Sequence, residues 1–156
     1  MPPAEGETVP AFEALRCTGE TFRSTRLQDA IEQGGVLVFF GFAFSAIDEN
    51  WWKRYDRADW DEFDVPVLGI SRDGPYALNA FIRYLDSPFE MFSDTDGAAT
   101  AAFDLRTSRE GMANTSTPMR SVFVVDENLT VQYRWIAEDW ISPVPREEIE
   151  TAVEKL

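Results

Sequence analysis

The sequence has no histidine, and among its 156 residues it has only one cysteine, Cys17, and two lysines. Without histidine, neither a Ser-His-Asp triad nor a Cys-His nucleophile pair can form. A single cysteine also excludes a C-x-x-C redox pair, an intrachain disulfide and a Cys/His zinc site within one chain. Carboxylates and tyrosines are therefore the side chains that remain for acid–base chemistry.

Long apolar runs are lacking too. No run approaches the roughly 20 residues that span a bilayer, and the first ten residues, MPPAEGETVP, have no apolar signal-peptide core. We therefore expect a cytoplasmic protein with no membrane partner. The composition, 44% hydrophobic and 13% aromatic, predicts a sizeable core. The length predicts one domain over residues 1–156.

Positive charge is scarce. The chain has 28 acidic and 14 basic residues, a net charge of −14, which disfavours binding to nucleic acid or to anionic membranes. The acidic residues are spread along the chain, which favours a solvated acidic surface over an acidic tail. Because concentrated salt screens self-repulsion, this lysine-poor, acidic composition leads us to hypothesise a halophilic source.

The stretch from Phe39 to Trp52, FFGFAFSAIDENWW, connects a buried strand to a helix that begins at about Ser45. Ser45 and Asp48 match the S-x-x-D capping pattern of a helix start. Four apolar residues then fall on one helical face: Ile47, Trp51, Trp52 and Tyr55. A helix N-terminus directly after a strand exposes backbone amides that favour a negative group.

The apolar patterns predict alternating strands and helices along the rest of the chain. We expect strands at 9–15, 21–23, 36–40, 65–70, 121–126 and 129–135, and helices at 27–33, 45–59, 98–103, after 71–75 and from 145. The first two strands form an N-terminal β-hairpin that turns near Gly19. Residues 106–119 are polar and contain Gly111 and Pro118, which predicts a loop. The fold class is α/β, with a central mixed sheet flanked by helices.

The strand–loop–helix stretch resembles the active-site motif of peroxiredoxins of the AhpC/TSA (alkyl hydroperoxide reductase / thiol-specific antioxidant) family. That motif reads F-x-P-x-x-F-[TS]-x-x-C, and its cysteine attacks the hydroperoxide. The sequence resembles it at Phe39, Ala43, Phe44 and Ser45, whereas Gly41 stands in place of the proline and Asp48 in place of the peroxidatic cysteine. The resemblance extends from about Val9 to the C-terminus and implies a thioredoxin-like fold. It includes three further segments: VPVLGIS at 65–71, FEMFSD at 89–94 and RSVFVVD at 120–126.

The resemblance also assigns site roles. In the family, a thiolate lies at the helix N-terminus, a hydroxyl orients the peroxide oxygens and an arginine stabilises the developing charge. Asp48, Ser45 and Arg120 stand at these three positions. The residues alone favour a helix cap for Ser45 and allow Asp48 to be its capping partner. Arg120 could be an exposed residue, but its place directly before a buried strand disfavours a purely exposed role. If the three converge, we expect an ionised Asp48 paired with Arg120.

A carboxylate is a poor nucleophile toward an O–O bond and has no sulfenic acid state. The resemblance therefore implies an antioxidant-family oxidoreductase homologue without thiol peroxidase activity, which acts as a binding or regulatory protein. It would bind a small anion or a hydroperoxide, form a homodimer and need no cofactor or metal. Two alternatives are a peroxidase that uses Cys17 as a displaced nucleophile, and an engineered Cys-to-Asp variant of an active enzyme. Cys17 is otherwise a small buried residue.

Other features of the sequence each allow two interpretations. Asp94 and Asp96, or the glutamates after Pro145, suggest either a divalent cation site or acidic first turns of helices. Trp51, Trp52 and Trp60 suggest either an aromatic ligand platform or core packing with a dimer contact.

Overall fold

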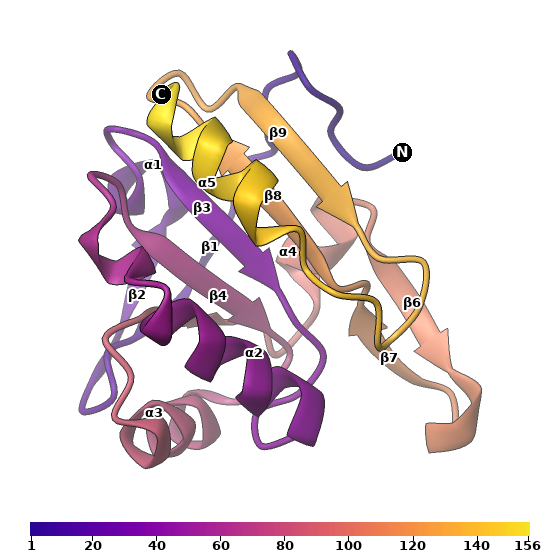
Figure 1. The fold of residues 1–156 in the computed structure, drawn as a ribbon. Coiled ribbons are helices and arrows are strands. Elements are labelled where there is room, and N and C mark those ends of the chain that lie inside the picture. The colour runs from indigo at the N-terminus through magenta and orange to yellow at the C-terminus, as the bar shows by residue number, and fades with distance from the viewer.

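The computed structural model describes residues 1–156 and is built around a seven-stranded mixed sheet with the order β2-β1-β5-β4-β3-β8-β9 (Figure 1). The strands are β1 Glu13–Cys17, β2 Phe22–Arg26, β3 Gly35–Phe39, β4 Val67–Ser71, β5 Glu90–Ser93, β8 Ser121–Val125 and β9 Val131–Ile136. Strands β3, β4 and β5 are parallel, and the others pair antiparallel with their neighbours. The predicted α/β class and N-terminal β1–β2 hairpin are confirmed.

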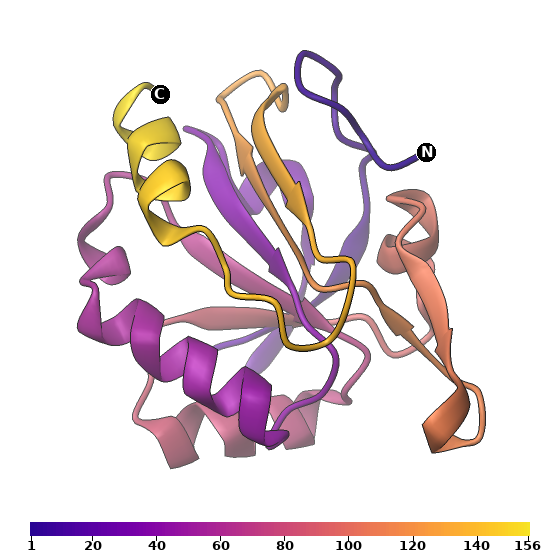
Figure 2. The same cartoon turned by 45° about the vertical axis from the view of Figure 1, so that its right-hand side comes forward.

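Helices cover both faces of this sheet (Figures 1 and 2). They are α1 Leu27–Ala30, α2 Ala46–Arg57, α3 Pro75–Leu85, α4 Ala98–Ala102 and α5 Arg146–Glu154, with 3-10 turns at Trp60–Glu62 and Glu110–Met112. Residues of α2, α3 and α5 belong to one apolar core, and residues of α1 and α4 belong to a second. None of these helices is both long and apolar enough to cross a membrane.

The central strand β3 explains why there are two cores. All five of its residues are buried, and successive side chains point to opposite faces of a sheet. Val36 and Val38 therefore join the core under α2, α3 and α5, whereas Leu37 and Phe39 join the core under α1 and α4. This two-sided burial is typical of a parallel strand that has helices on both faces.

One predicted region is wrong. Residues 106–119 are not a loop but a second, two-stranded antiparallel sheet of β6 Arg106–Arg109 and β7 Thr115–Pro118. The strand sequences RTSR and TSTP have no apolar alternation, because this hairpin extends away from the main sheet, as Figure 2 shows. Polar hairpins of this kind leave little hydrophobic signal in the sequence.

The predicted helix at 27–33 is also longer than the observed α1, which ends at Ala30. The chain then turns at Gly34, whose φ of 100° lies in the left-handed region that favours glycine. A side chain at this position would also begin 2.7 Å from the backbone oxygen of Val125. The turn fixes the point at which β3 enters the sheet between β4 and β8.

The remaining aromatic and acidic candidates take structural positions. Trp51, Trp52 and Trp60 are buried, and the Trp60 ring stacks on Tyr55 with centroids 4.3 Å apart, so they pack the core. The carboxylate of Asp94 accepts hydrogen bonds from two backbone amides at the start of α4, at 2.9 Å each. Asp94 precedes the helix and caps the free amides of its first turn from outside.

Candidate functional site

The candidate site lies at the loop between β3 and α2. Ser45 is the N-cap of α2, and its hydroxyl accepts a hydrogen bond from the Asp48 amide at 3.3 Å and donates one to Asp48 Oδ2 at 2.7 Å. Ser45 is therefore the N-cap of α2, as the S-x-x-D pattern predicts, but Asp48 accepts from the Ser45 hydroxyl and not from the Ser45 amide, which donates to the carbonyl of Phe42. Just before it, Phe44 has a φ of 68°, a left-handed conformation that is rare for a bulky residue. Strained backbone of this kind clusters at functional sites.

A neighbouring loop fixes this turn from the side. Asp73, at the β4–α3 connection, accepts hydrogen bonds from the Ala43 amide at 2.8 Å and from the Ser71 hydroxyl at 2.7 Å. The loops at the C-terminal ends of the adjacent parallel strands β3 and β4 are therefore hydrogen-bonded to each other. In open α/β sheets, ligands bind at this edge.

Asp48 is almost completely buried, with 4% of its surface exposed. Its Oδ2 accepts the hydrogen bond from Ser45 and a second from the Phe42 amide at 3.2 Å. Burial raises the pKa of Asp48, and these hydrogen bonds together with the charges of Arg120 and Arg109 lower it only in part. Desolvation thus opposes the helix dipole and the arginine charge, on which the expectation of an ionised Asp48 rested.

Arg120 is equally buried, also at 4% exposure, but it does not form the predicted ion pair with Asp48. Its Nη1 instead donates to the carbonyl of Ser142 at 2.9 Å, because the segment between β9 and α5 folds back over the start of β8. Its Nη2 is buried and has no hydrogen-bond partner. The prediction of a direct Asp48–Arg120 pair is therefore wrong, although the two side chains line the same cavity.

A small cavity of about 10 Å³ lies between the two side chains. Asp48, Arg120 and Tyr55 all line it, and burial raises the pKa of Tyr55, so that its hydroxyl stays protonated. This volume suits about one water molecule. Asp48 and Arg120 therefore act on each other through charge across a gap and not through contact.

Sequence reasoning missed Arg109, which β6 brings over the β3–α2 loop. Its Nε donates to the hydroxyl of Thr117 at 3.1 Å, and its guanidinium lies 3.5 Å from the ring centre of Trp140 and 5.3 Å from that of Phe42. The charge of Asp48 opposes the burial that lowers the pKa of Arg109. The site thus contains two arginines near one carboxyl group.

Arg109 also explains the glycine in the motif. A side chain at Gly41 would begin 2.1 Å from Arg109 Nη2, so the guanidinium occupies the space that the family's proline would fill. The only sign of this contact in the sequence is Gly41, which stands where the peroxiredoxin motif has proline. Arg109 could not be matched to it, because residues 106–119 were predicted to be a loop.

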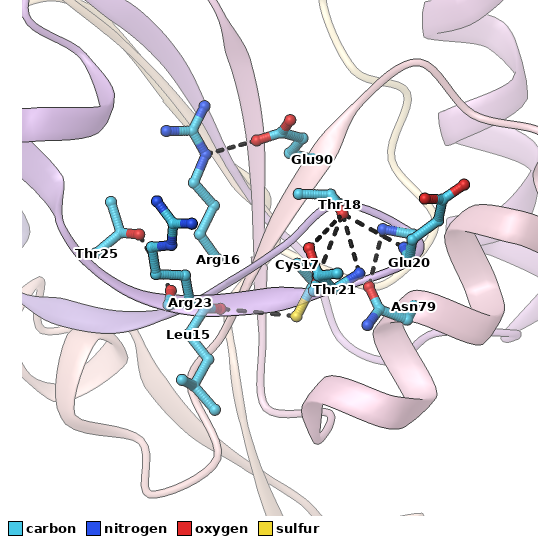
Figure 3. Close-up of polar contacts among 11 residues, drawn as sticks. Leu15, Arg16, Cys17, Thr18, Glu20, Thr21, Arg23, Thr25, Asn79 and Glu90 are labelled. Carbon is cyan, nitrogen blue, oxygen red and sulfur yellow. Dashed lines mark hydrogen bonds and ion pairs between the residues drawn. The ribbon is translucent and has the colours of Figure 1, made fainter.

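Cys17 lies elsewhere, in β1, with β5 and β4 between its strand and β3. It is fully buried, and burial raises the pKa of its thiol to about 11. Its only polar contact is a weak one, 3.7 Å from Sγ to the carbonyl of Leu15, and Figure 3 shows it beside the hydrogen-bonded turn between Thr18 and Thr21. The structure does not bring Cys17 together with Asp48.

The sheet order and the helices on its two faces define a thioredoxin-like fold. Solved structures agree: AhpC from Mycobacterium tuberculosis superposes with a TM-score of 0.79 at 17% identity, over 99% of this chain and 93% of that one. AhpC from Enterococcus faecalis gives 0.81 at 16% (98% and 92%), and peroxidoxin BcpB from M. tuberculosis gives 0.75 at 22% (97% and 95%). At these identities the comparison shows the fold.

Membership in a family rests on the sequence. The AhpC/TSA family profile matches residues 6–134, most of the chain, so the protein belongs to the AhpC/TSA (peroxiredoxin) family. No curated protein matches the sequence significantly.

Proposed function

We propose that this peroxiredoxin-family protein lacks thiol peroxidase activity and acts as a binding or regulatory protein through the pocket at the start of α2. The observation that carries the proposal is the burial of Asp48 in the first turn of α2, where the motif resemblance puts the peroxidatic cysteine. A carboxyl group there cannot attack an O–O bond and be recycled by a thiol reductant. An engineered Cys-to-Asp variant of an active enzyme would have the same residue at this position. Such a variant would lack thiol peroxidase activity for the same reason.

The surroundings of Cys17 support the same conclusion. Attack on a peroxide needs an exposed thiolate in an electropositive place. Cys17 is fully buried, and its raised pKa of about 11 keeps the thiol protonated at neutral pH. A peroxidase that uses Cys17 as a displaced nucleophile would need the N-terminal hairpin to open.

The proposed ligand is a small anion or a hydroperoxide. Because the cavity beside Asp48 has room for about one water molecule, such a ligand would enter only if the surrounding side chains move apart. Two arginines, Arg109 and Arg120, supply positive charge, and Ser45 supplies a hydroxyl. Asp48 supplies competing negative charge, so an anion would bind more tightly when this carboxyl group is protonated. No cofactor or metal enters the proposal.

We extend the proposal to the setting of the protein. The acidic, lysine-poor composition supports a halophilic source, and a cytoplasmic location and a homodimer remain predictions. Thermal unfolding at increasing concentrations of potassium chloride tests the halophilic source. We expect the melting temperature to rise continuously into molar potassium chloride, because salt screens the net charge of −14. Equal stability in dilute buffer would contradict it.

The decisive experiment measures consumption of hydrogen peroxide and of an organic hydroperoxide in high salt with dithiothreitol. We expect the native chain and Cys17→Ser to be equally inactive. Asp48→Cys should gain activity, because the new thiol has the helix N-terminus and two arginines beside it. We expect a gain of about tenfold or more over the control.

The matched control is Asp56→Cys, which makes the same replacement on the exposed face of the same helix. It reports the background reaction of any new thiol. Turnover by the native chain that disappears in Cys17→Ser would overturn the proposal and make Cys17 the nucleophile. An inactive Asp48→Cys variant would show that the pocket has lost more than its nucleophile.

A further inference from the structure

The cavity beside Asp48 is too small for the ligand that the proposed function requires. Its volume of about 10 Å³ suits one water molecule, and only 4% of the surface of Asp48 is exposed. Most of its lining comes from core residues of β3, α2 and β8, which separate only if an apolar core opens. A ligand therefore needs a neighbouring segment that moves while the core stays closed.

The β6–β7 hairpin is tied to the body of the protein by few contacts. No residue of 106–118 belongs to either apolar core, and the two strands pair only with each other (Figure 2). A single hydrogen bond joins this range to the rest of the chain, from Arg72 Nη1 to the carbonyl of Ser116 at 3.0 Å. Opening of such a segment costs much less free energy than unfolding of the core.

The side chain of Arg109 is the second attachment of the hairpin. Its guanidinium lies 3.5 Å from the ring centre of Trp140 and 5.3 Å from that of Phe42, both within the range of cation–π contacts. Its Nη2 fills the space beside Gly41, where any added side chain would collide with it. Gly41 is buried although it has no side chain of its own. Arg109 thus covers the turn between β3 and α2.

This turn is the one that holds Asp48. The Phe42 amide donates to Asp48 Oδ2 at 3.2 Å, so the residue that Arg109 contacts is bonded directly to the carboxyl group. The charges of Arg109 and Asp48 also attract each other, and each shifts the pKa of the other toward the ionised form. Release of Arg109 therefore loosens the turn at the site itself.

Trp140, the other partner of Arg109, belongs to a loop that is fixed at both ends. The Ala137 amide donates to the backbone carbonyl of Arg120 at 2.8 Å, and Arg120 Nη1 donates to the carbonyl of Ser142 at 2.9 Å. The loop is thus held to the residue that begins β8. Between the two contacting segments, the hairpin is the one that is free to move.

We propose that the β6–β7 hairpin is a lid on the Asp48 site and that Arg109 is its latch. In the closed arrangement described here, Arg109 contacts Trp140 and covers the turn at Gly41. In the open arrangement, the hairpin swings about its base, where the Met119 amide donates to the carbonyl of Leu105 at 2.8 Å, and a small anion enters. The inference rests on the proposed function in that it takes the Asp48 pocket to bind a ligand.

Alkylation of a thiol introduced at the site tests the lid. In a Cys17→Ser/Asp48→Cys chain the only thiol replaces the Asp48 carboxyl group, and iodoacetamide is a small, neutral probe of access to it. We expect Arg109→Ala in this background to raise the alkylation rate at least about tenfold. Loss of the positive charge acts in the opposite direction, because it raises the pKa of a nearby thiol and lowers its thiolate fraction. A faster reaction therefore reports opening.

Two further variants and a control separate the latch from general loosening. Arg109→Lys keeps the charge but removes the planar guanidinium, and Trp140→Leu removes the ring on which it stacks; we expect each to raise the rate severalfold. Arg106→Ala makes the same replacement at an exposed position of the same hairpin and should leave the rate unchanged. An unchanged rate in Arg109→Ala, or an equal rise in Arg106→Ala, would overturn the proposal.

Hydrogen exchange of the native chain tests the lid without any substitution. We expect the hydrogen-bonded amides of β6 and β7 to exchange together, at least about tenfold faster than those of β3 and β8. The Phe42 amide, which donates to Asp48, should exchange with the hairpin. Hairpin amides as protected as those of β3 would contradict the lid, even if the Asp48→Cys chain failed to fold.

These tests are separate from the peroxide assay. If the native chain consumes no peroxide and the alkylation and exchange rates show no opening, only the lid is wrong. If Arg109→Ala speeds alkylation and the native chain consumes peroxide, only the loss of peroxidase activity is wrong.

Discussion

Asp48 and Cys17 are both buried titratable side chains, and burial raises the pKa of each, but their surroundings differ. Asp48 lies at the start of α2, where a hydroxyl, a backbone amide and the charges of Arg109 and Arg120 act on it. Cys17 lies within a strand ladder, and its thiol has one weak contact to a carbonyl.

The comparison shows why burial alone does not mark a site. Desolvation acts on both groups, so the informative difference is the set of polar partners that converge on Asp48. At Cys17 the neighbouring polar groups are already satisfied among themselves, as in the Arg16–Glu90 pair and the Thr18–Thr21 turn of Figure 3. The residues around Cys17 thus have a structural role, whereas those around Asp48 form a candidate binding site.

The largest expected effect that tests the difference between Asp48 and Cys17 is the low reactivity of the Cys17 thiol. The pKa of about 11 for Cys17, against an ordinary value of 9.0, lowers the thiolate fraction about a hundredfold, and full burial adds to this. We expect labelling by dithiobis(nitrobenzoate) to be slower than about one hundredth of the rate after unfolding in denaturant. A Cys17→Ser/Asp56→Cys chain, with its thiol on the exposed face of α2, should label rapidly without denaturant. Rapid native labelling of Cys17 would reopen it as a candidate nucleophile.

The fold was predictable because its signals are local and apolar. The runs at 36–40 and 121–126 indicate buried strands by themselves, and Ser45 with Asp48 indicates the start of α2 before any tertiary contact is known. The β6–β7 hairpin was not predictable, because its polar strands pair with each other outside the main sheet. Its strands have no alternation of apolar and polar residues that would predict them from the sequence.

The site was predictable only as a set of positions. Resemblance grouped Ser45, Asp48 and Arg120. In the structure Asp48 and Arg120 line one cavity, and Ser45 is hydrogen-bonded to Asp48. The resemblance could not show that Arg120 would donate a hydrogen bond to Ser142, or that Arg109 would reach Gly41 from a separate hairpin. Both depend on contacts between segments far apart in the chain, which a local pattern does not encode.

A second, smaller effect concerns the protonation of Asp48. Its pKa is raised in the folded state, so the folded chain holds this proton more tightly than the unfolded chain does. Stability from this group is therefore fully present below the unfolded pKa and declines as the pH rises through the folded pKa. Asp48→Asn removes the ionised form, and we expect it to raise the free energy of unfolding near neutral pH by about 1 kcal/mol.

Urea unfolding of both chains between about pH 4 and pH 8 measures this difference. The two stability curves should diverge as the pH increases, with the asparagine variant above the native chain. Asp56→Asn, on the exposed face of α2, should change stability by less than about 0.5 kcal/mol at every pH. Curves that stay parallel for Asp48→Asn would show that its partners offset burial completely.

The smallest expected effect concerns the contact between Gly41 and Arg109, which is absent from the Cys17 region. Gly41→Ala places a carbon 2.1 Å from Arg109 Nη2, and because the guanidinium ends a flexible side chain it can move away. We expect a loss of about 1 kcal/mol or less in the free energy of unfolding. Arg109→Gln should cost a similar amount, and the double variant should cost less than the sum, because both changes remove the same contact. Gly111→Ala, where the added carbon meets no atom within 4 Å, is the control. Strict additivity would show that Arg109 does not depend on the glycine.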